Sequence, residues 1–257
     1  MVLAEEMSIG ERFLDVSKGL SGETISSLII IGIIILLSFY ISIRAHFADP
    51  LKKPKGILLL AEIGITFFDD MVANMMGRRY KGFGGFILAI AVYLFLAFIF
   101  GLTGLPSPVT YLATPLSLGL ITFTLIHANA VRFNKFKYFK RFVDPIPVLL
   151  PVNLLSMWAP LLSLTLRLFG NALAGWTIMT LLYTALESVS ASIFSNIPGG
   201  FGGAILPPFV TPVLHAYFDL FSGLIQTTVF LFLTMILIAN EGPEEDELDA
   251  SLQKGGN

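Results

Sequence analysis

The chain has 257 residues, of which 55% are hydrophobic and 13% are charged, and its mean hydropathy is +0.80. A soluble domain carries about 25% charged residues, so this composition excludes a soluble multidomain protein and predicts an integral membrane protein. With a net charge of -2, no separate basic domain and no cysteine, nothing indicates a nucleic-acid-binding module, a disulfide framework or a thiolate metal site.

The first expected span covers residues 25–43. It lies between Glu23 and Arg44, which are separated by 20 uncharged residues, and about 20 residues cross a bilayer core. The acidic residues that precede the span stand where a cleavable signal peptide needs basic ones. We therefore expect this span to be retained in the mature protein.

Residues 56–77 predict an amphipathic helix that lies in the membrane interface. Glu62, Asp69 and Asp70 alternate with large apolar residues at helical spacing, and lysines and arginines flank the segment on both sides.

Residues 83–131 then contain no Asp, Glu, Lys or Arg. This stretch predicts two spans that form a hairpin, joined at the Gly- and Pro-rich segment 101–108.

The following loop, residues 132–145, is basic and rich in aromatic side chains. Next to a span, such a loop is typical of a membrane-surface anchor rather than a nucleic-acid site.

Two long apolar regions follow, 146–192 and 207–240, separated by the Gly- and Pro-rich loop 193–206. Both exceed the length needed to cross a bilayer. Either they tilt steeply against a curved neighbour, or each contains a short hairpin or break.

The basic residues predict the orientation. Twelve of the 16 lysines and arginines fall in the segments 44–55, 78–81 and 132–141. The positive-inside rule places these segments in the cytoplasm, with residues 1–24 and loop 193–206 outside and the acidic tail 241–257 inside. The predicted fold is thus an all-α integral membrane protein with about five transmembrane helices and one interfacial helix.

Three charged residues interrupt the two long apolar regions: Arg167, Glu187 and Asp219. Ionisable groups inside a membrane are costly, so the expected role of all three is functional. Arg167 carries a fixed positive charge, which needs an anion or a watery cavity nearby. The alternative is a structural salt bridge from Arg167 to Asp219 or Glu187.

Two helix faces carry the remaining candidate residues. Gly170, Asn171 and Ala174 follow Arg167 at helical spacing, and this stripe of small or polar residues predicts contact with a protein partner, or packing within the chain itself. On the last helix, His215, Asp219, Gly223 and Gln226 recur at i, i+4, i+8 and i+11. This row is typical of a polar pathway, and Glu187 is expected to join His215 and Asp219 in one external vestibule.

The run Leu-Thr-Leu-Arg-Leu-Phe-Gly-Asn-Ala-Leu-Ala-Gly at 164–175 closely resembles the signature of subunit a of F-type ATP synthases. Pro151-Val152-Asn153 and Leu224-Ile225-Gln226 are also similar to the family. The resemblance implies a static subunit beside a rotating ring of c subunits, with two offset half-channels. It further implies that Arg167 is the essential arginine, that Asn171 is its polar neighbour and that Gln226 is the amide of the last helix.

The same resemblance implies the partners and location of the chain. They are the c-subunit ring, subunit b or other peripheral stalk subunits, and the lipid bilayer of a bacterial-type plasma membrane or an equivalent energy-coupling membrane. We expect no nucleic acid, metal or cofactor, and no ATP chemistry on this chain, because no Gly-x-x-x-x-Gly-Lys-Ser/Thr loop occurs. The coupling ion is expected to be a proton or a sodium ion.

Two positions depart from the family pattern. Trp176 stands where many members carry Glu or His, and Asp219 stands where relatives show His, Glu or a small residue. We infer that Asp219 takes over the channel role. The alternative function is a self-contained proton-coupled transporter, which the absence of a visible internal repeat disfavours.

Overall fold

The computed structural model describes residues 21–49, 52–135, 138, 150–195 and 202–242. Five helices in these ranges are long and apolar enough to cross a membrane, and no strand occurs in them. The expected fold class, an all-α integral membrane protein with about five spans, is confirmed. The external N-terminal segment, most of the basic loop 132–145 and nearly all of the acidic tail lie outside the described residues.

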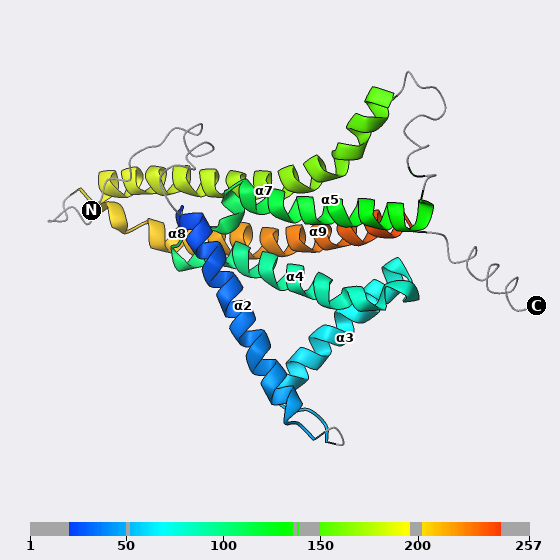
Figure 1. The fold of residues 1–257 in the computed structure, drawn as a ribbon. Helices are drawn as coiled ribbons and strands as arrows, with labels where there is room; N and C mark the ends of the chain where they lie inside the picture. Colours follow the sequence, from blue (N-terminus) through cyan, green and yellow to red (C-terminus); the bar gives the residue numbers. More distant parts are fainter. Residues whose placement is uncertain (1–20, 50–51, 136–137, 139–149, 196–201, 243–257) are drawn as a thin grey trace, which may run out of the picture.

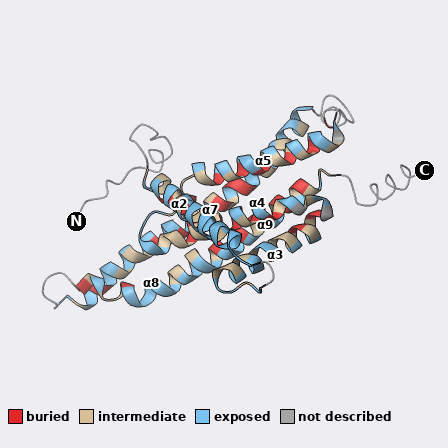
Figure 2. Ribbon diagram, turned by 60° about the horizontal axis from the view of Figure 1, so that its bottom comes forward, coloured by how far each residue is buried: buried red, intermediate tan, exposed pale blue. Residues whose placement is uncertain are grey.

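Helix α2, Gly22–His46, crosses the other spans obliquely (Figure 1). Its first turn is capped by Ser21, whose Oγ accepts a hydrogen bond from the Thr24 amide at 3.3 Å. A hydrogen bond of 2.7 Å between Ser27 Oγ and Tyr93 Oη ties it to α4. Most of α2 is exposed in Figure 2, as expected for an apolar helix that faces lipid.

Helix α3, Ile57–Met76, corresponds to the expected interfacial helix, and it is not among the five candidate spans. Glycines in left-handed conformations bound it, Gly56 with φ 63° and Gly77 with φ 88°, so the chain turns sharply at both ends. Its buried side chains are Val72 and Met76, which pack into the core. Its position at the membrane interface remains a prediction.

The expected hairpin consists of two helices and short 3₁₀ segments. After η1, Arg78–Phe83, helix α4 runs from Gly84 to Ile99 and continues into η2, Phe100–Thr103. The 3₁₀ turn η3, Pro108–Thr110, leads into α5, Ala113–Asn134.

The core is built mainly around α4, where apolar residues from the other helices converge. Figure 2 shows residues coloured as buried along α4 and along the last helix, α9. The largest fully buried side chains of the core include Ile30, Ile87, Leu94, Leu168, Phe230 and Met235.

Helix α7, Leu150–Ile193, is continuous over 44 residues. At 1.5 Å per residue it is about 66 Å long, twice the thickness of a bilayer core. Figure 1 shows a bend in its first third, in the stretch that contains Pro160. Proline removes one backbone hydrogen bond and clashes with the preceding turn, which explains a bend there.

The last helical rod is also continuous, from Pro207 to Ala239. It consists of α8, Pro207–His215, a π-helical segment η6, Ala216–Phe221, and α9, Ser222–Ala239. Within their described residues, 150–192 and 207–240, neither long region therefore contains a hairpin. Of the two alternatives, the continuous helices favour the one in which length is accommodated by tilt.

Ser190 fastens the return of the chain from α7 to α8. Its buried Oγ donates to the Gly202 carbonyl and accepts from the Leu206 amide at 3.2 Å. This contact holds the start of α8 beside the end of α7, so the last helical rod runs back along α7 (Figure 1).

Candidate functional site

Helices α7 and α9 lie side by side and run in opposite directions (Figure 1). Two contacts set their register. Ser222 Oγ donates to Asn171 Oδ1 at 3.0 Å, and Phe218 packs against Gly175, where an added Cβ would meet the phenyl ring at 3.6 Å. Because the helices are antiparallel, Arg167, four residues before Asn171, lies at the level of Gln226, four residues after Ser222.

Arg167 is half-buried, and its Nη2 donates a long hydrogen bond of 3.4 Å to Ser163 Oγ, one turn earlier. Within the described residues it forms no ion pair with Asp219 or Glu187. The structural salt bridge weighed above is therefore not formed. A guanidinium group has five N–H donors, so most of its capacity remains available to a group outside the chain.

The small-residue stripe after Arg167 lies at the surface of α7. Gly170 and Ala174 are exposed and Asn171 is half-buried. A Cβ added at Gly170 would have no heavy atom within 4 Å. Asn171 thus contacts α9, whereas Gly170 and Ala174 are open, and another helix could approach the backbone closely beside them.

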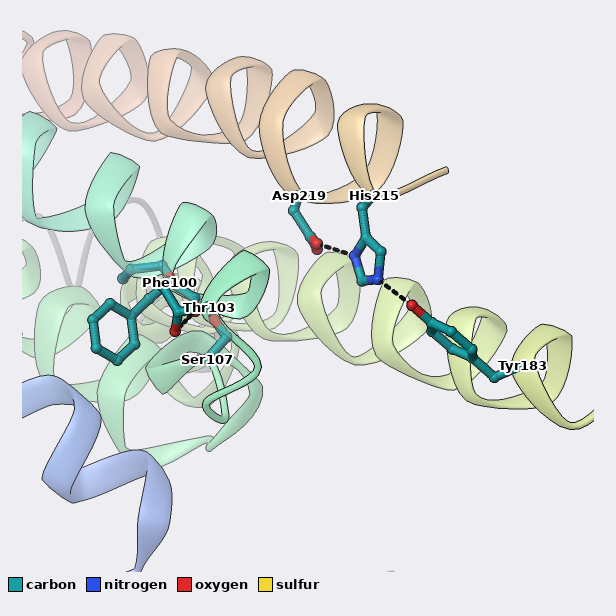
Figure 3. Close-up of polar contacts among 7 residues, drawn as sticks. Phe100, Thr103, Ser107, Tyr183, His215 and Asp219 are labelled. Carbon is teal, nitrogen blue, oxygen red and sulfur yellow. Dashed lines mark hydrogen bonds and ion pairs between the residues drawn. The ribbon is translucent and has the colours of Figure 1, made fainter. Parts of the chain in front are cut away.

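Three side chains form a hydrogen-bonded line near the other end of the helix pair (Figure 3). Asp219 Oδ2 lies 2.5 Å from His215 Nδ1, and His215 Nε2 lies 3.0 Å from Tyr183 Oη. A neutral imidazole would donate a hydrogen bond from Nδ1 to the carboxylate and would accept a hydrogen bond at Nε2 from the tyrosine hydroxyl. The side chains of His215 and Asp219 keep 27% and 24% of their surface exposed, so part of the pair lies at the surface of the subunit.

Asp219 also faces the end of α4. Its carboxylate carbon lies 3.8 Å from the position that a Cβ on Gly101 would occupy. The same end of the hairpin carries two hydroxyl groups (Figure 3). Thr103 Oγ1 donates a hydrogen bond to the Phe100 carbonyl, and Ser107 Oγ donates one to a carbonyl of α4. The side chain of Asp219 thus extends from the last helical rod towards the end of the hairpin, which carries small and polar residues.

The π-helical segment changes the expected row on the last helix. The prediction assumed α-helical spacing from His215 to Gln226, but a π turn contains more residues than an α turn. As a result His215 points to Tyr183 on α7, while Asp219 lies near Gly101 of the hairpin. Gln226 is buried, with 8% of its surface exposed, and lies apart from the half-exposed pair.

Glu187 is not brought to His215 and Asp219. Its side chain is exposed, and no hydrogen bond or ion pair joins it to either residue in the described part of the chain. Trp176, the departure from the family pattern, is exposed on the same helix. The roles of Glu187, Asp219, His215, Arg167 and the other candidates stay predictions.

The sequence reasoning missed Tyr183, Ser222 and Gly101. A signal was present for Tyr183, which precedes Glu187 by four residues and therefore shares its helix face. The partners of Ser222 and Gly101 depend on the packing of separate helices, which no local pattern encodes.

Comparison with known proteins identifies the family. The family model described as ATP synthase A chain matches residues 25–239. The ATP synthase subunit a of Mycoplasma genitalium is 34% identical over 219 residues, which cover 80% of this chain and 75% of that protein. The corresponding protein of Mycoplasma pneumoniae is 34% identical over 214 residues, with 78% and 73% covered.

A third relative is described as sodium ion specific. This ATP synthase subunit a of Propionigenium modestum is 29% identical over 189 residues, which cover 67% of this chain and 58% of that protein. The family model and the two Mycoplasma proteins cover most of the helical region described above, including the run around Arg167. The chain therefore belongs to the ATP synthase A chain family, the multi-pass, ion-translocating membrane subunit a of F-type ATP synthases.

Proposed function

We propose that ions cross the membrane along this subunit by two half-channels whose separation depends on Arg167. In the proposed orientation, the Tyr183–His215–Asp219 line belongs to the external half-channel. Its three side chains are joined by hydrogen bonds of 3.0 and 2.5 Å and are only partly buried within the subunit. An entering proton can bind the Asp219 carboxylate or the imidazole and pass to a carboxylate on the neighbouring ring.

Arg167 acts on the loaded ring site after it has travelled around. A fixed guanidinium charge favours the ionised form of a passing carboxylate, so it promotes release of the ion. The same charge bars direct passage of cations between the half-channels. The open surface at Gly170 and Ala174 supports this role, because it lets a ring helix approach beside Arg167.

The remaining features follow from this assignment. The long helices α7 and α9 tilt against the ring, subunit b or other stalk subunits hold the chain static, and ATP chemistry takes place on other subunits. The N-terminus lies outside and the acidic tail lies in the cytoplasm. The proposal covers both protons and sodium ions, since ion selectivity should reside mainly in the ring.

One observation carries the proposal: a half-buried arginine in a candidate membrane span forms no ion pair within the described chain. Arg167→Lys should abolish ATP-driven ion uptake into membrane vesicles although the complex assembles, because lysine is a shorter and more strongly hydrated charge. Arg167→Ala should also abolish uptake and permit a passive leak.

Ser163→Ala serves as the control. It removes only the 3.4 Å hydrogen bond of Arg167, and uptake should stay within about threefold of the wild type. A purely structural arginine predicts loss of assembly in Arg167→Ala, with rescue when Asp219 and Glu187 are neutralised as well. Coupled uptake by that triple variant would contradict the proposal.

A further inference from the structure

Two arginines from separate segments stand over one phenyl ring at the end of the hairpin. The guanidinium carbon of Arg79, in η1, lies 4.7 Å from the ring centroid of Phe133, and that of Arg132, in the last turn of α5, lies 5.7 Å from it. A cation within about 6 Å of an aromatic face is attracted by the ring. The two positive charges are therefore at most about 10 Å apart, which is comparable with the screening length of about 8 to 10 Å in physiological salt.

A hydrogen bond between Tyr80 and Asn129 fixes this arrangement. Asn129 Nδ2 of α5 donates to Tyr80 Oη at 2.7 Å and to the Ile238 carbonyl of α9, also at 2.7 Å. Tyr80 follows Arg79 directly in η1. Asn129 lies one turn before Phe133 on the same face of α5. The contact that docks η1 on α5 thus brings the first arginine to the ring, so the pair of charges belongs to the packed framework of the helices.

No acidic side chain of the described residues balances the two arginines. The sequence contains no Asp or Glu between Asp70 and Asp144. Within the described ranges neither Arg79 nor Arg132 forms an ion pair, and both are exposed. Two like charges held close together repel each other, and an anion placed between them offsets this repulsion. The pair therefore has the charge, and five N–H donors in each guanidinium group, that an anion-binding site requires.

The arginines lie where two candidate spans meet the membrane boundary. Helix α4 belongs to the span Gly84–Thr103, and α5 belongs to the span Ala113–Phe133. Figure 1 shows the start of α4 and the end of α5 at the same end of the helix bundle. Basic residues at the end of a span attract the phosphates of anionic lipids, and basic pockets between transmembrane helices bind lipid head groups. The position thus favours a lipid over a phosphate ion that is dissolved in the solvent.

An apolar surface continues from the arginines along α5. Every fourth residue of one row on this helix is exposed: Leu116, Leu120, Thr124, Ala128 and Arg132. The hydroxyl of Thr124 donates to the Leu120 carbonyl at 2.8 Å, so it presents no unsatisfied polar group to lipid. The row is about 24 Å long, and one leaflet takes about half of a hydrocarbon core of ~30 Å. An acyl chain can therefore lie along α5 while its phosphate contacts Arg132.

We propose that Arg79 and Arg132 bind the phosphate of one anionic phospholipid, whose acyl chains pack along the exposed face of α5. Each planar guanidinium group pairs with two phosphate oxygens, and the ring of Phe133 presents both groups to the same lipid. Phosphatidylglycerol has the required charge, whereas the ammonium group of phosphatidylcholine compensates its own phosphate. The inference needs only that α4 and α5 span the bilayer, so it is independent of the proposed ion route and of the orientation of the chain.

Photo-crosslinking to a lipid probe tests the site in the complete complex, reconstituted in vesicles. A photoactivatable phosphatidylglycerol should label the subunit about tenfold less in Arg79→Gln with Arg132→Gln than in the wild type, normalised to assembled complex. Labelling by the phosphatidylcholine analogue should not change. The matched control is Arg44→Gln with Lys53→Gln, which removes two exposed positive charges from another segment and should leave labelling within about twofold. Equal losses in the two double variants would mean attraction by net charge alone and would overturn the inference.

Phe133→Leu distinguishes a built site from two independent charges. It keeps both arginines but removes the ring that holds them together, so labelling by phosphatidylglycerol should fall about threefold or more. Unchanged labelling would overturn the inference, as would displacement of the lipid by excess inorganic phosphate at constant ionic strength. Deletion of residues 243–257 removes the acidic tail, a competing anion within the chain. Labelling that appears only after this deletion would mean that the tail occupies the arginines, and the lipid site would be refuted.

Discussion

Asp219→Asn separates the proton-binding role of this carboxylate from its structural role. Asparagine has nearly the same shape, and its Oδ1 can still accept the hydrogen bond from His215 Nδ1, which now spans 2.5 Å. What is lost is the charge. A hydrogen bond to a charged group contributes about 1.5 to 3 kcal/mol and a neutral one about 0.5 to 1.5, so the structural loss is about 1 kcal/mol. A complex of ordinary stability survives this change.

Transport should respond much more strongly. A positioned proton donor or acceptor contributes about 10²- to 10⁴-fold to the rate of a transfer step, so ATP-driven uptake should fall about 100-fold or more in Asp219→Asn. Asp219→Glu should retain part of the activity, because its carboxylate titrates but reaches about 1.5 Å further. The assay is ion uptake into inverted membrane vesicles, normalised to the amount of assembled complex.

Tyr183→Phe is the matched control for the line of hydrogen bonds. It removes one neutral hydrogen bond of 3.0 Å to His215 and should slow uptake only about two- to tenfold. Wild-type uptake by Asp219→Asn would refute the reasoning, as would a larger defect in Tyr183→Phe than in Asp219→Asn. Either result would assign the carboxylate a structural role.

Three further sets of substitutions test other parts of the structure. Trp176→Phe should leave uptake within about twofold of the wild type, because an indole does not titrate in the working range; a loss of coupling would show that its N–H is needed. Gly119→Ala should destabilise the subunit by about 1 to 3 kcal/mol, measured as a lower melting temperature, because its Cβ would collide with α7, whereas Gly64→Ala meets no atom within 4 Å and should not. In intact cells, the single cysteine of Lys52→Cys should be protected from impermeant reagents, whereas that of Ser195→Cys should be labelled. Labelling of Lys52→Cys from outside would mean that the orientation is the opposite one.

The sequence predicted the fold class because hydropathy, charge clusters and helix breakers are local signals. Five spans and the position of Arg167 on a long helix follow from such signals alone. The continuity of that helix through Pro160 did not follow, because the effect of one proline depends on the neighbouring helices.

The candidate site was predictable only where it depends on spacing along one helix. His215 and Asp219 are four residues apart and form a hydrogen bond. Their third partner, Tyr183, comes from another helix, and the expected vestibule with Glu187 is not formed in the described structure. Packing between helices decides these contacts, and the π-helical segment between His215 and Ser222 changes the direction in which each side chain points.

That π-helical segment also sets the rotational phase between the two halves of the last helical rod. One residue corresponds to about 100° of rotation in an α-helix. A π turn holds more residues than an α turn, so deleting one exposed residue there, such as Tyr217, would let the rod become α-helical throughout while α8 and α9 keep nearly the same relative rotation. His215 would then still face Tyr183 and Ser222 would keep its bond to Asn171, whereas α-helical geometry without a deletion would turn His215 away by about 100°. The segment therefore lets the external half of the subunit keep its direction although the chain carries about one residue more there than a fully α-helical rod would need.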